Sequence, residues 1–253
     1  MQKLLLLLIT TIIGLITSLT TLKGRTINNI TETKTVPLSH FENIDSDMIF
    51  NVEVVKSNEE KAVITSNYMQ FVNISVKNNT LHIGYKRNQS MENVNTRIVI
   101  FAKDVKSVSA STASVVKIKN VFNIQKFNTE SGGKIFGDSN AKNISISTQS
   151  GGSVLGTMNT DHLVLNAESG SSINIQGKIG TATISSEEAS KITATKTNIS
   201  VATINAESAS SVTLSVSKQL IASASSLATI RYKTLSGIKF SATRDSGGTI
   251  DML

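Results

Sequence analysis

The side chains whose spacing best suits chemistry are acidic or amide groups that recur about once every nineteen residues. They are Glu130, Gln149, Glu168, Glu187, Glu207, Ser225 and Asp245. If each repeat forms one coil of a stacked structure, Glu168, Glu187 and Glu207 lie about 4.8 Å apart. Carboxylates that close repel one another unless they face water, take up a proton or bind a cation, and oxygen ligands suit Ca²⁺. We interpret the row as solvated and partly balanced by Lys134 and Lys191, with a calcium site at the three glutamates as the alternative.

Other chemistry-bearing patterns are missing from the sequence. The three histidines, His40, His82 and His162, are far apart, and none has a metal-ligand neighbour at motif spacing. The sequence contains no nucleophile elbow, phosphate-binding glycine loop or metalloprotease helix motif. It also contains no Cys, which excludes disulfides and thiolate metal sites. We therefore expect no catalytic residue and no cofactor.

The acidic row belongs to an internal repeat built on a corner of small residues. Eight five-residue segments begin at Ser111, Ser131, Ser150, Ser169, Glu188, Ser208, Ser226 and Ser246. The fifth residue of each is β-branched and aliphatic: Val115, Ile135, Val154, Ile173, Ile192, Val212, Ile230 and Ile250. A second column precedes the corner by four residues: Phe127, Ile146, Leu165, Ile184, Ile204, Ala222 and Ala242. Spacing by two around each corner is the periodicity of β-strands.

This pattern predicts an all-β fold, a parallel β-solenoid of about eight 19-residue coils over residues 106–253. One coil cannot bury its aliphatic column, whereas stacked coils make the column continuous and remove it from water. Pairs such as Gly132-Gly133 and Ala209-Ser210 suit a tight bend with positive φ. A helix is excluded by the β-branched, Gly- and Ser-rich composition and by the period.

Residues 36–105 lack the corner motif, and we expect a mainly antiparallel β region that caps the solenoid. The alternating runs lie at 51–55, 62–65, 72–76, 81–83 and 97–101. Asn78-Asn79 predicts a hairpin turn between two of them, and the polar segment 86–95 predicts a loop.

The N-terminus has the composition of a targeting segment. A short positive start is followed by an uncharged apolar stretch from Leu4 to Leu22, so residues 1–24 are a signal peptide or an N-terminal anchor. Residues 25–35 are expected to form a linker. The rest of the chain would be exported, to the periplasm, the outer membrane surface or the extracellular space.

Three segments resemble the bacterial autotransporter adhesin head domain, or GIN domain. They are the opening Phe41-Glu-Asn-Ile44 with Phe50-Asn-Val-Glu-Val54, the hairpin from Asn73 to Ile83, and the recurring Ser-Gly-Gly-x-Val/Ile corners. The resemblance covers residues 41–250, although Gly-Ile-Asn of the family appears here as Ile49-Phe50-Asn51. It implies a right-handed β-helix with added strands and a role in adhesion.

The leading hypothesis for function is therefore a non-catalytic binding or structural module of the cell envelope, with an envelope or extracellular polymer or protein as partner. The alternative is a polysaccharide-acting lyase or glycosidase that uses the Glu168, Glu187 and Glu207 row. A hexapeptide-repeat acyltransferase is disfavoured because the spacing breaks a six-residue period. Scattered basic residues argue against nucleic-acid binding, and a membrane would be contacted only through an uncleaved N-terminal segment.

The chain stops three residues after Ile250, which predicts a homo-oligomer through an uncapped C-terminal coil.

Overall fold

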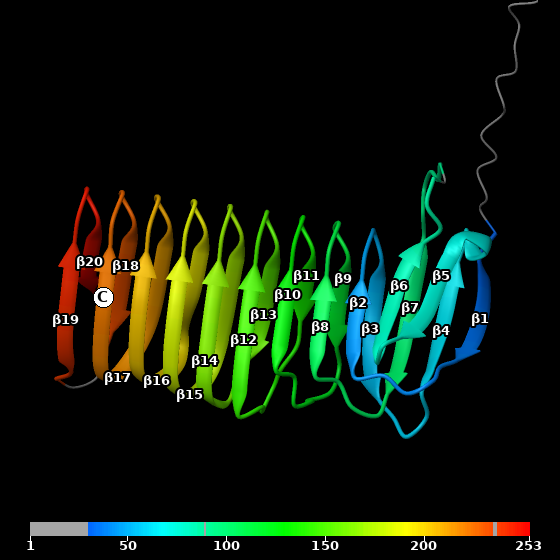
Figure 1. Ribbon diagram of the computed structural model, residues 1–253, viewed down its shortest axis with the longest axis horizontal. Helices are drawn as coiled ribbons and strands as arrows, with labels where there is room; N and C mark the ends of the chain where they lie inside the picture. Colours follow the sequence, from blue (N-terminus) through cyan, green and yellow to red (C-terminus); the bar gives the residue numbers. More distant parts are fainter. Residues whose placement is uncertain (1–29, 89, 235–236) are drawn as a thin grey trace, which may run out of the picture. The chain divides into compact units, whose positions relative to one another are not determined.

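The computed structural model describes residues 30–88, 90–234 and 237–253, so the expected signal or anchor at 1–24 lies outside the described residues. Residues 31–253 form one compact unit. Its described residues contain twenty strands and a single short 3-10 helix, η1 (Met69–Phe71). All twenty strands belong to one continuous hydrogen-bonded sheet that is wound into a solenoid (Figure 1). The predicted all-β solenoid is confirmed.

Each coil has two faces joined by a tight corner on one edge and a looser turn on the other. Face A contains β8 (Ser107–Ala110), β10 (Lys126–Thr129), β12 (Asn143–Thr148), β14 (Thr160–Ala167) and β19 (Lys239–Arg244). Face B contains β9 (Val115–Ile118), β11 (Lys134–Phe136), β13 (Ser153–Thr157), β18 (Thr229–Lys233) and β20 (Thr249–Met252). Three long strands continue from face B of one coil through the turn to face A of the next: β15 (Ser172–Ser186), β16 (Lys191–Ala206) and β17 (Ser211–Ala224).

We call the two edges of the coil the corner edge and the turn edge. The chain rises along face A, crosses the corner edge, descends along face B and advances by one coil at the turn edge (Figure 1). The resulting winding is right-handed, as the family resemblance implied.

The two predicted apolar columns line the interior. Phe127, Ile146 and Leu165 pair in register on successive face A strands, and each is fully buried. Ile135, Val154 and Ile173 do the same on face B, with at most 1% of the side chain exposed. Because alternate side chains of a strand point to opposite faces, each column leaves water only through contact with the coils above and below it.

One member of the predicted face B column is wrong. Ile135 pairs with Val116, which is buried, whereas Val115 pairs with Lys134 and points outward, partly exposed. The first corner is therefore centred on Thr112 and Ala113, one residue later than the repeat alignment placed it. A shift of one residue along a strand moves every side chain to the opposite face.

Each corner is a turn of two residues in the left-handed conformation. The first corner residue has φ near +50°, as in Ser131, Ser150 and Glu188, and the second has a larger positive φ. The second position is Gly in four coils, but Ala113, Ala189, Ala209 and Leu227 occupy it in the others. Its N–H donates to the first corner residue of the next coil, as from Gly132 to the carbonyl oxygen of Ser150 at 3.0 Å.

The third corner residue is buried and small. Ser171, Ser190 and Ser210 occupy this position, and their hydroxyls donate to backbone carbonyl oxygens of the preceding coil at 2.7–2.9 Å. In one other coil the residue is Ala228, and in three it is glycine: a Cβ at Gly133 would overlap the carbonyl group of Ala110. This position therefore admits Gly, Ala or a hydrogen-bonded Ser because the backbones of adjacent coils approach closely there.

The N-terminal strands are mixed in direction. They are β1 (Glu32–Pro37), β2 (Asn43–Ser46), β3 (Asn51–Lys56), β4 (Lys61–Ser66), β5 (Val72–Lys77), β6 (Thr80–Tyr85) and β7 (Thr96–Ala102). The expected antiparallel pairing joins β1 to β4, β4 to β7 and β5 to β6. In contrast, β2 and β3 form a further solenoid coil that pairs parallel with β6 and β7 on one side and with β8 and β9 on the other.

Two further expectations concern this region. The hairpin turn at Asn78-Asn79 is confirmed, since both residues have positive φ and connect β5 to β6. The linker expected over residues 25–35 is corrected, because β1 begins at Glu32 and pairs with β4 along its whole length. The strand was missed because its side chains are mostly exposed, so it lacks an apolar alternation.

Candidate functional site

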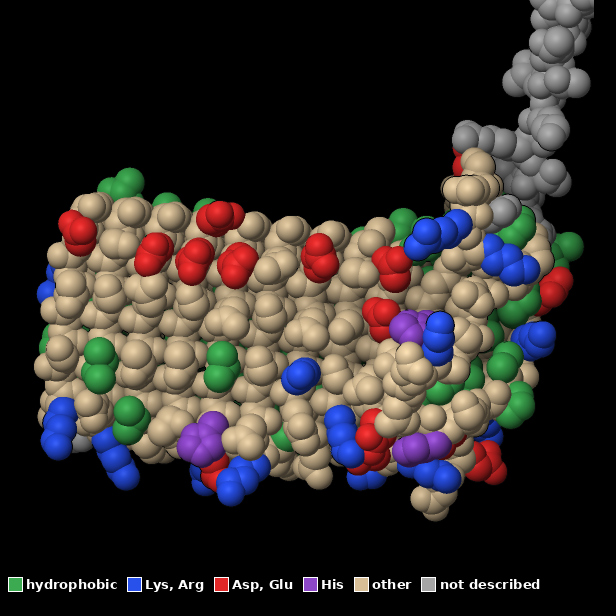
Figure 2. Space-filling view, in the orientation of Figure 1, with side chains coloured by type: hydrophobic (Ala, Val, Ile, Leu, Met, Phe, Trp, Pro, Cys, Tyr) green, Lys and Arg blue, Asp and Glu red, His purple; other side chains and the backbone are tan. Residues whose placement is uncertain are grey.

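The acidic row predicted from the sequence lies along the corner edge of face A. Red side chains follow this edge in Figure 2. The three glutamates of the predicted calcium site each have a neutral hydrogen-bond partner: Glu168 accepts from Gln149 at 3.1 Å, and Glu207 accepts from Asn205 at 2.7 Å. Glu187 accepts from the Ser185 hydroxyl at 3.1 Å. The three predicted carboxylates are therefore aligned one per coil rather than gathered around a common point. No group of three or more potential metal ligands was found in the part of the chain that the structure describes.

The three histidines lie in different surroundings. His40 contacts Glu60 at 3.0 Å, His82 on β6 contacts Asp45 on β2 at 3.2 Å, and His162 on β14 contacts the Thr181 hydroxyl at 2.8 Å. All three contacts are made by Nδ1. The structure does not bring the histidines together.

Face A presents a regular polar surface. Its middle outward column has one short side chain per coil, in register: Ser109, Asn128, Ser147, Asn166, Ser185, Asn205, Ser223 and Thr243. In Figure 2 this surface is mostly tan, with isolated green side chains. Val164 and Ile221, 39% and 42% exposed, belong to the neighbouring outward column. The face offers hydroxyl and amide groups repeated at the strand spacing of about 4.8 Å.

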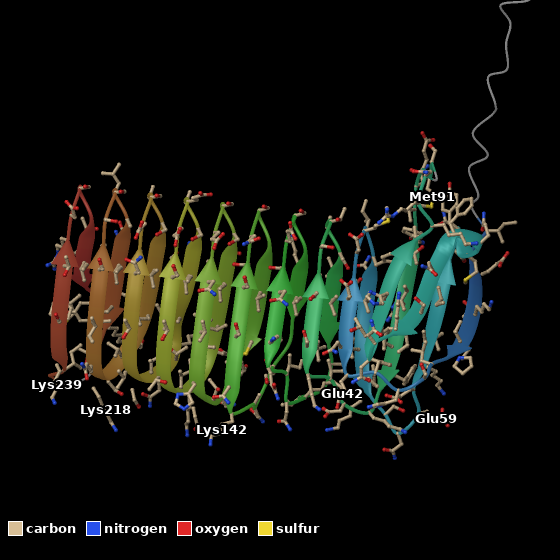
Figure 3. The ribbon with its side chains drawn as sticks, viewed as in Figure 1. Glu42, Glu59, Met91, Lys142, Lys218 and Lys239 are labelled. Atoms are coloured by element: carbon tan, nitrogen blue, oxygen red, sulfur yellow. The ribbon has the colours of Figure 1, made fainter. Side chains whose placement is uncertain are left out.

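Basic residues that look scattered in the sequence gather on the turn edge. The exposed lysines there are Lys142, Lys178, Lys196, Lys218, Lys233 and Lys239. Blue side chains mark the lower edge of the solenoid in Figure 2, and Figure 3 shows Lys142, Lys218 and Lys239 projecting from it. Within the described residues, none of these lysines forms an ion pair. The fold thus separates an acidic corner edge from a basic turn edge.

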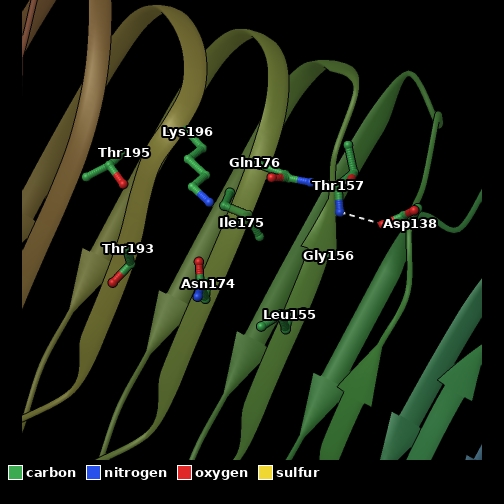
Figure 4. Close-up of a pocket in the computed structure, with 10 residues that line it drawn as sticks. All are labelled: Asp138, Leu155, Gly156, Thr157, Asn174, Ile175, Gln176, Thr193, Thr195 and Lys196. Carbon is green, nitrogen blue, oxygen red and sulfur yellow. Dashed lines mark hydrogen bonds between the residues drawn. The ribbon is translucent and has the colours of Figure 1, made fainter.

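A hollow of about 460 Å³ opens on face B beside the turn edge (Figure 4). Its lining includes Asp138, Thr157 and Gln176, which are joined by hydrogen bonds: the Thr157 N–H donates to Asp138 at 2.7 Å, and the Gln176 amide donates to the Thr157 hydroxyl at 3.1 Å. Gly156 lies at its base, where a Cβ would overlap the carbonyl oxygen of Gly137. In Figure 4 the ammonium end of Lys196 points into the hollow.

The hollow depends on irregular coil lengths. The pairing of β15 with β16 shifts register between Asn174 and Gln176, and the pairing of β16 with β17 shifts between Ala194 and Ile199. These shifts bring Thr195 and Lys196 to the surface in the longer coil that follows Glu188. Sequence reasoning missed this surface because the corner columns, which define the repeat, lie on the opposite edge.

Ion pairs are concentrated in the N-terminal coils. Glu42 pairs with Lys106, and Glu53 pairs with Arg97 at 3.0 Å and with Lys119 at 3.7 Å. The hydrogen bond from Lys106 lowers the pKa of Glu42 below its ordinary 4.5. The hydrogen bond from Arg97 likewise lowers the pKa of Glu53. Because these pairs connect neighbouring strands, we assign them a structural role. Across the described ranges, no helix is both long and apolar enough to span a membrane.

Solved structures show the same architecture. A putative adhesin from Parabacteroides merdae aligns with a TM-score of 0.80 at 17% identity, covering 89% of this chain and 97% of its own. A putative lipid binding protein from Parabacteroides distasonis aligns with a TM-score of 0.78 at 17% identity, covering 89% and 98%. A putative adhesin from Bacteroides fragilis has a TM-score of 0.62 at 18% identity, covering 90% and 99%. At these identities the likeness establishes the fold.

A search of curated proteins found no match. A family model described as "Putative auto-transporter adhesin, head GIN domain" matches residues 40–234, which include the N-terminal strands and most of the coils. This range includes the opening strands, the hairpin and all of the corners that carried the resemblance except the last, at Ser246. The chain therefore belongs to the auto-transporter adhesin head GIN domain family.

Proposed function

We propose that this protein is an exported, non-catalytic binding module of the cell envelope that acts as an adhesin. The observation that carries the proposal is the regular polar surface of face A, on which each coil repeats a short hydroxyl or amide side chain. Such a surface is complementary to an extended partner whose polar groups also repeat. The family description and the apolar N-terminal segment add support for adhesion and export.

The partner is an envelope or extracellular polymer or protein that lies across several coils. A long, preformed sheet face loses little conformational entropy on binding, because its side chains are short and its backbone is fixed by neighbouring strands. Many weak hydrogen bonds, each near the typical net value of about 1 kcal/mol, then add up along the solenoid axis.

Two experiments test this function. Protease shaving of intact cells should degrade the protein, and the purified full chain should bind envelope glycans or matrix proteins on an array. Ser147→Arg with Asn166→Arg places bulky side chains on face A and should weaken that binding. Ser153→Arg with Ser172→Arg, which alters outward positions of face B by the same charge, is the matched control and should bind as wild type. Protection from protease together with no bound ligand would refute the proposal.

We also propose that the protein self-associates through its C-terminal coil. In the described part of the chain, β19 and β20 have a strand partner on one side only. Phe240 pairs with the buried Leu220, and Met252 continues the column of the buried Leu214, yet they are 44% and 66% exposed. A second copy would cover these side chains and pair the open edges. Light scattering should show association that rises with concentration and falls in Phe240→Gln. A monomer at every concentration would contradict this.

A further inference from the structure

A shallow trough follows the turn edge at the point where the chain enters face A. Two rows of side chains, one member per coil, form its sides. The first row is Asn140, Asn159, Lys178 and Asn198, and the second is Lys142, Asp161, Gly180 and Ser200. Ala141, Thr160 and Ile179 lie between the rows as a buried floor. The trough has a volume of about 720 Å³ and runs parallel to the solenoid axis.

The walls of the trough are held in place by hydrogen bonds between coils. The Asn159 side chain donates to the Asn140 side chain at 3.0 Å and accepts from the backbone N–H of Lys178 at 3.1 Å. The Thr160 hydroxyl donates to the carbonyl oxygen of Lys142 at 2.8 Å. At Gly180 a Cβ would come within 2.6 Å of the Asp161 carbonyl oxygen, so a side chain there is excluded. The trough is therefore preformed, which reduces the entropy lost when a ligand binds.

The charge of the trough is set by its position on the basic edge. Lys142 and Lys178 lie two coils apart, about 10 Å along the axis at the strand spacing. Neither lysine has a carboxylate partner within the described structure. Asp161 is the one acidic residue of the lining, and Lys196 and Lys218 extend the positive edge beyond it. The acidic row lies on the opposite edge of the face (Figure 2).

We propose that this trough binds an acidic polysaccharide, one that carries carboxylates on regularly repeated sugar units. The proposal rests on the proposed binding function and names the ligand class. Lys142 and Lys178 pair with ligand carboxylates, while Asn140, Asn198 and Ser200 exchange hydrogen bonds with sugar hydroxyls. Asp161 accepts hydrogen bonds from sugar hydroxyl groups, which every unit of a polysaccharide carries. The lining presents no large exposed apolar side chain for insertion into lipid.

The test compares two charge-matched double variants of the full chain. Lys142→Gln with Lys178→Gln removes both trough lysines. Lys134→Gln with Lys191→Gln removes two exposed lysines of face B near the corner edge, so its net charge is the same. Binding is measured by calorimetry against polygalacturonate, dextran and phosphatidylglycerol vesicles, and thermal unfolding verifies that both variants fold. All four lysines are exposed, so neither variant disturbs the core.

Wild type should bind polygalacturonate, more weakly as salt rises, and should bind dextran and vesicles poorly. The trough variant should bind polygalacturonate about tenfold more weakly or worse, the ratio expected for loss of charge-assisted hydrogen bonds. The face B variant should bind as wild type. The proposal would be overturned if both variants lost affinity for polygalacturonate equally, or if the trough variant kept the wild-type affinity. It would also be overturned if wild type bound dextran or vesicles more tightly than polygalacturonate. If the protein bound another envelope polymer or protein, and the trough lysines made no difference to that binding, this inference alone would be overturned. If the protein stayed inside the cell and bound nothing, the proposed function would be refuted.

Discussion

At the level of single residues, the corners combine two solutions to one conformational requirement. The second corner residue has φ between +58° and +80° in all eight coils from Ala113 to Gly247, including Gly151 at +73° and Ala189 at +58°. Glycine adopts this region freely, whereas an L-residue with a Cβ is disfavoured there by about 1–2 kcal/mol. The coils that carry Ala113, Ala189, Ala209 or Leu227 are therefore locally strained.

Exchanging the two residue types should change stability in opposite directions. Ala189→Gly should raise the free energy of unfolding by about 1 kcal/mol, and Gly151→Ala should lower it by about the same amount. A Cβ at Gly151 would meet nothing within 4 Å, so the effect is that of the backbone alone. Urea denaturation measures both variants, and midpoints that stay fixed or move in the same direction would contradict the account.

The buried corner serines give a second prediction. The Ser190 hydroxyl donates to the carbonyl oxygen of Ala167 at 2.8 Å and lies 2.8 Å from the Ser186 hydroxyl. Ser190→Ala leaves the Ser186 hydroxyl without this partner and should lower the free energy of unfolding by about 1–3 kcal/mol. Ser186→Ala together with Ser190→Ala should recover part of the loss, since the buried Ala224 and Ala228 occupy the equivalent positions two coils later. Additive losses in the double variant would show that the two hydroxyls do not interact.

The sequence predicted the acidic row because its members share the phase of the corner, which defines the repeat. It did not predict the basic edge, because Lys142, Lys178 and Lys196 occupy different positions within their coils. Lys196 also lies where the pairing of β16 with its neighbours shifts register, so its place relative to the corner columns cannot be read from the period. Only the folded turns place these lysines along one edge of the solenoid.

At the level of strands, register decides which side chains are buried. Small residues surround the first corner on both sides, so composition alone allowed it to be placed at Ser111 rather than Thr112. The pairing of β9 with β11 removes the ambiguity, because it aligns Val116 with Ile135. The remaining seven members of the column were predicted correctly because Gly or Ser-rich corners fixed their phase.

This register predicts unequal effects for two adjacent valines. Val116→Ala removes buried methyl groups and should lower the free energy of unfolding by about 2 kcal/mol. Val115→Ala, at a partly exposed position, should change it by no more than about 0.5 kcal/mol. Chemical denaturation distinguishes the two. A larger loss for Val115→Ala would restore the alignment that the structure corrects.

The N-terminal strands are arranged in an order that no local pattern reveals. The coil formed by β2 and β3 lies between β6 and β7 on one side and β8 and β9 on the other, although β4 and β5 follow it in sequence. Alternation predicted the strands β3 to β7, since it reports which side chains are buried. It carries no information about which strands are neighbours.

Ion pairs across these neighbours make the N-terminal coils sensitive to acid. The pKa values of Glu42 and Glu53 are lowered by Lys106 and Arg97, so the charged forms are favoured in the folded protein. The stabilisation that these ion pairs give to the folded protein is complete above the ordinary glutamate pKa of 4.5. It is lost as the pH falls through the lower pKa values of the two glutamates in the folded state. As the pH is lowered below 4.5, the melting temperature of the double variant Glu42→Gln with Glu53→Gln should therefore fall less steeply than that of wild type. Parallel pH profiles would contradict this role.

At the level of the whole solenoid, the buried core and the proposed binding surface arise from the same repetition. Apolar columns stack inside, polar side chains stack on face A, and the two edges carry opposite charge. The periodicity predicted the stack and its core, because burying an aliphatic column requires contact with the coils on either side. The trough follows the same repetition at the turn edge, with one member of each row per coil, and its charge became visible only in the structure.

The most direct test of the stacked coils is a ladder of distances along one outward column. The sequence has no Cys, so pairs of introduced cysteines can carry spin labels without background. Ser109, Asn205 and Thr243 are outward on face A, with Asn205 five coils and Thr243 seven coils from Ser109. At the strand spacing we predict label separations of about 24 Å for Ser109→Cys with Asn205→Cys and about 34 Å for Ser109→Cys with Thr243→Cys. Separations that do not increase by about 4.8 Å for each coil would show that the coils are not stacked in register.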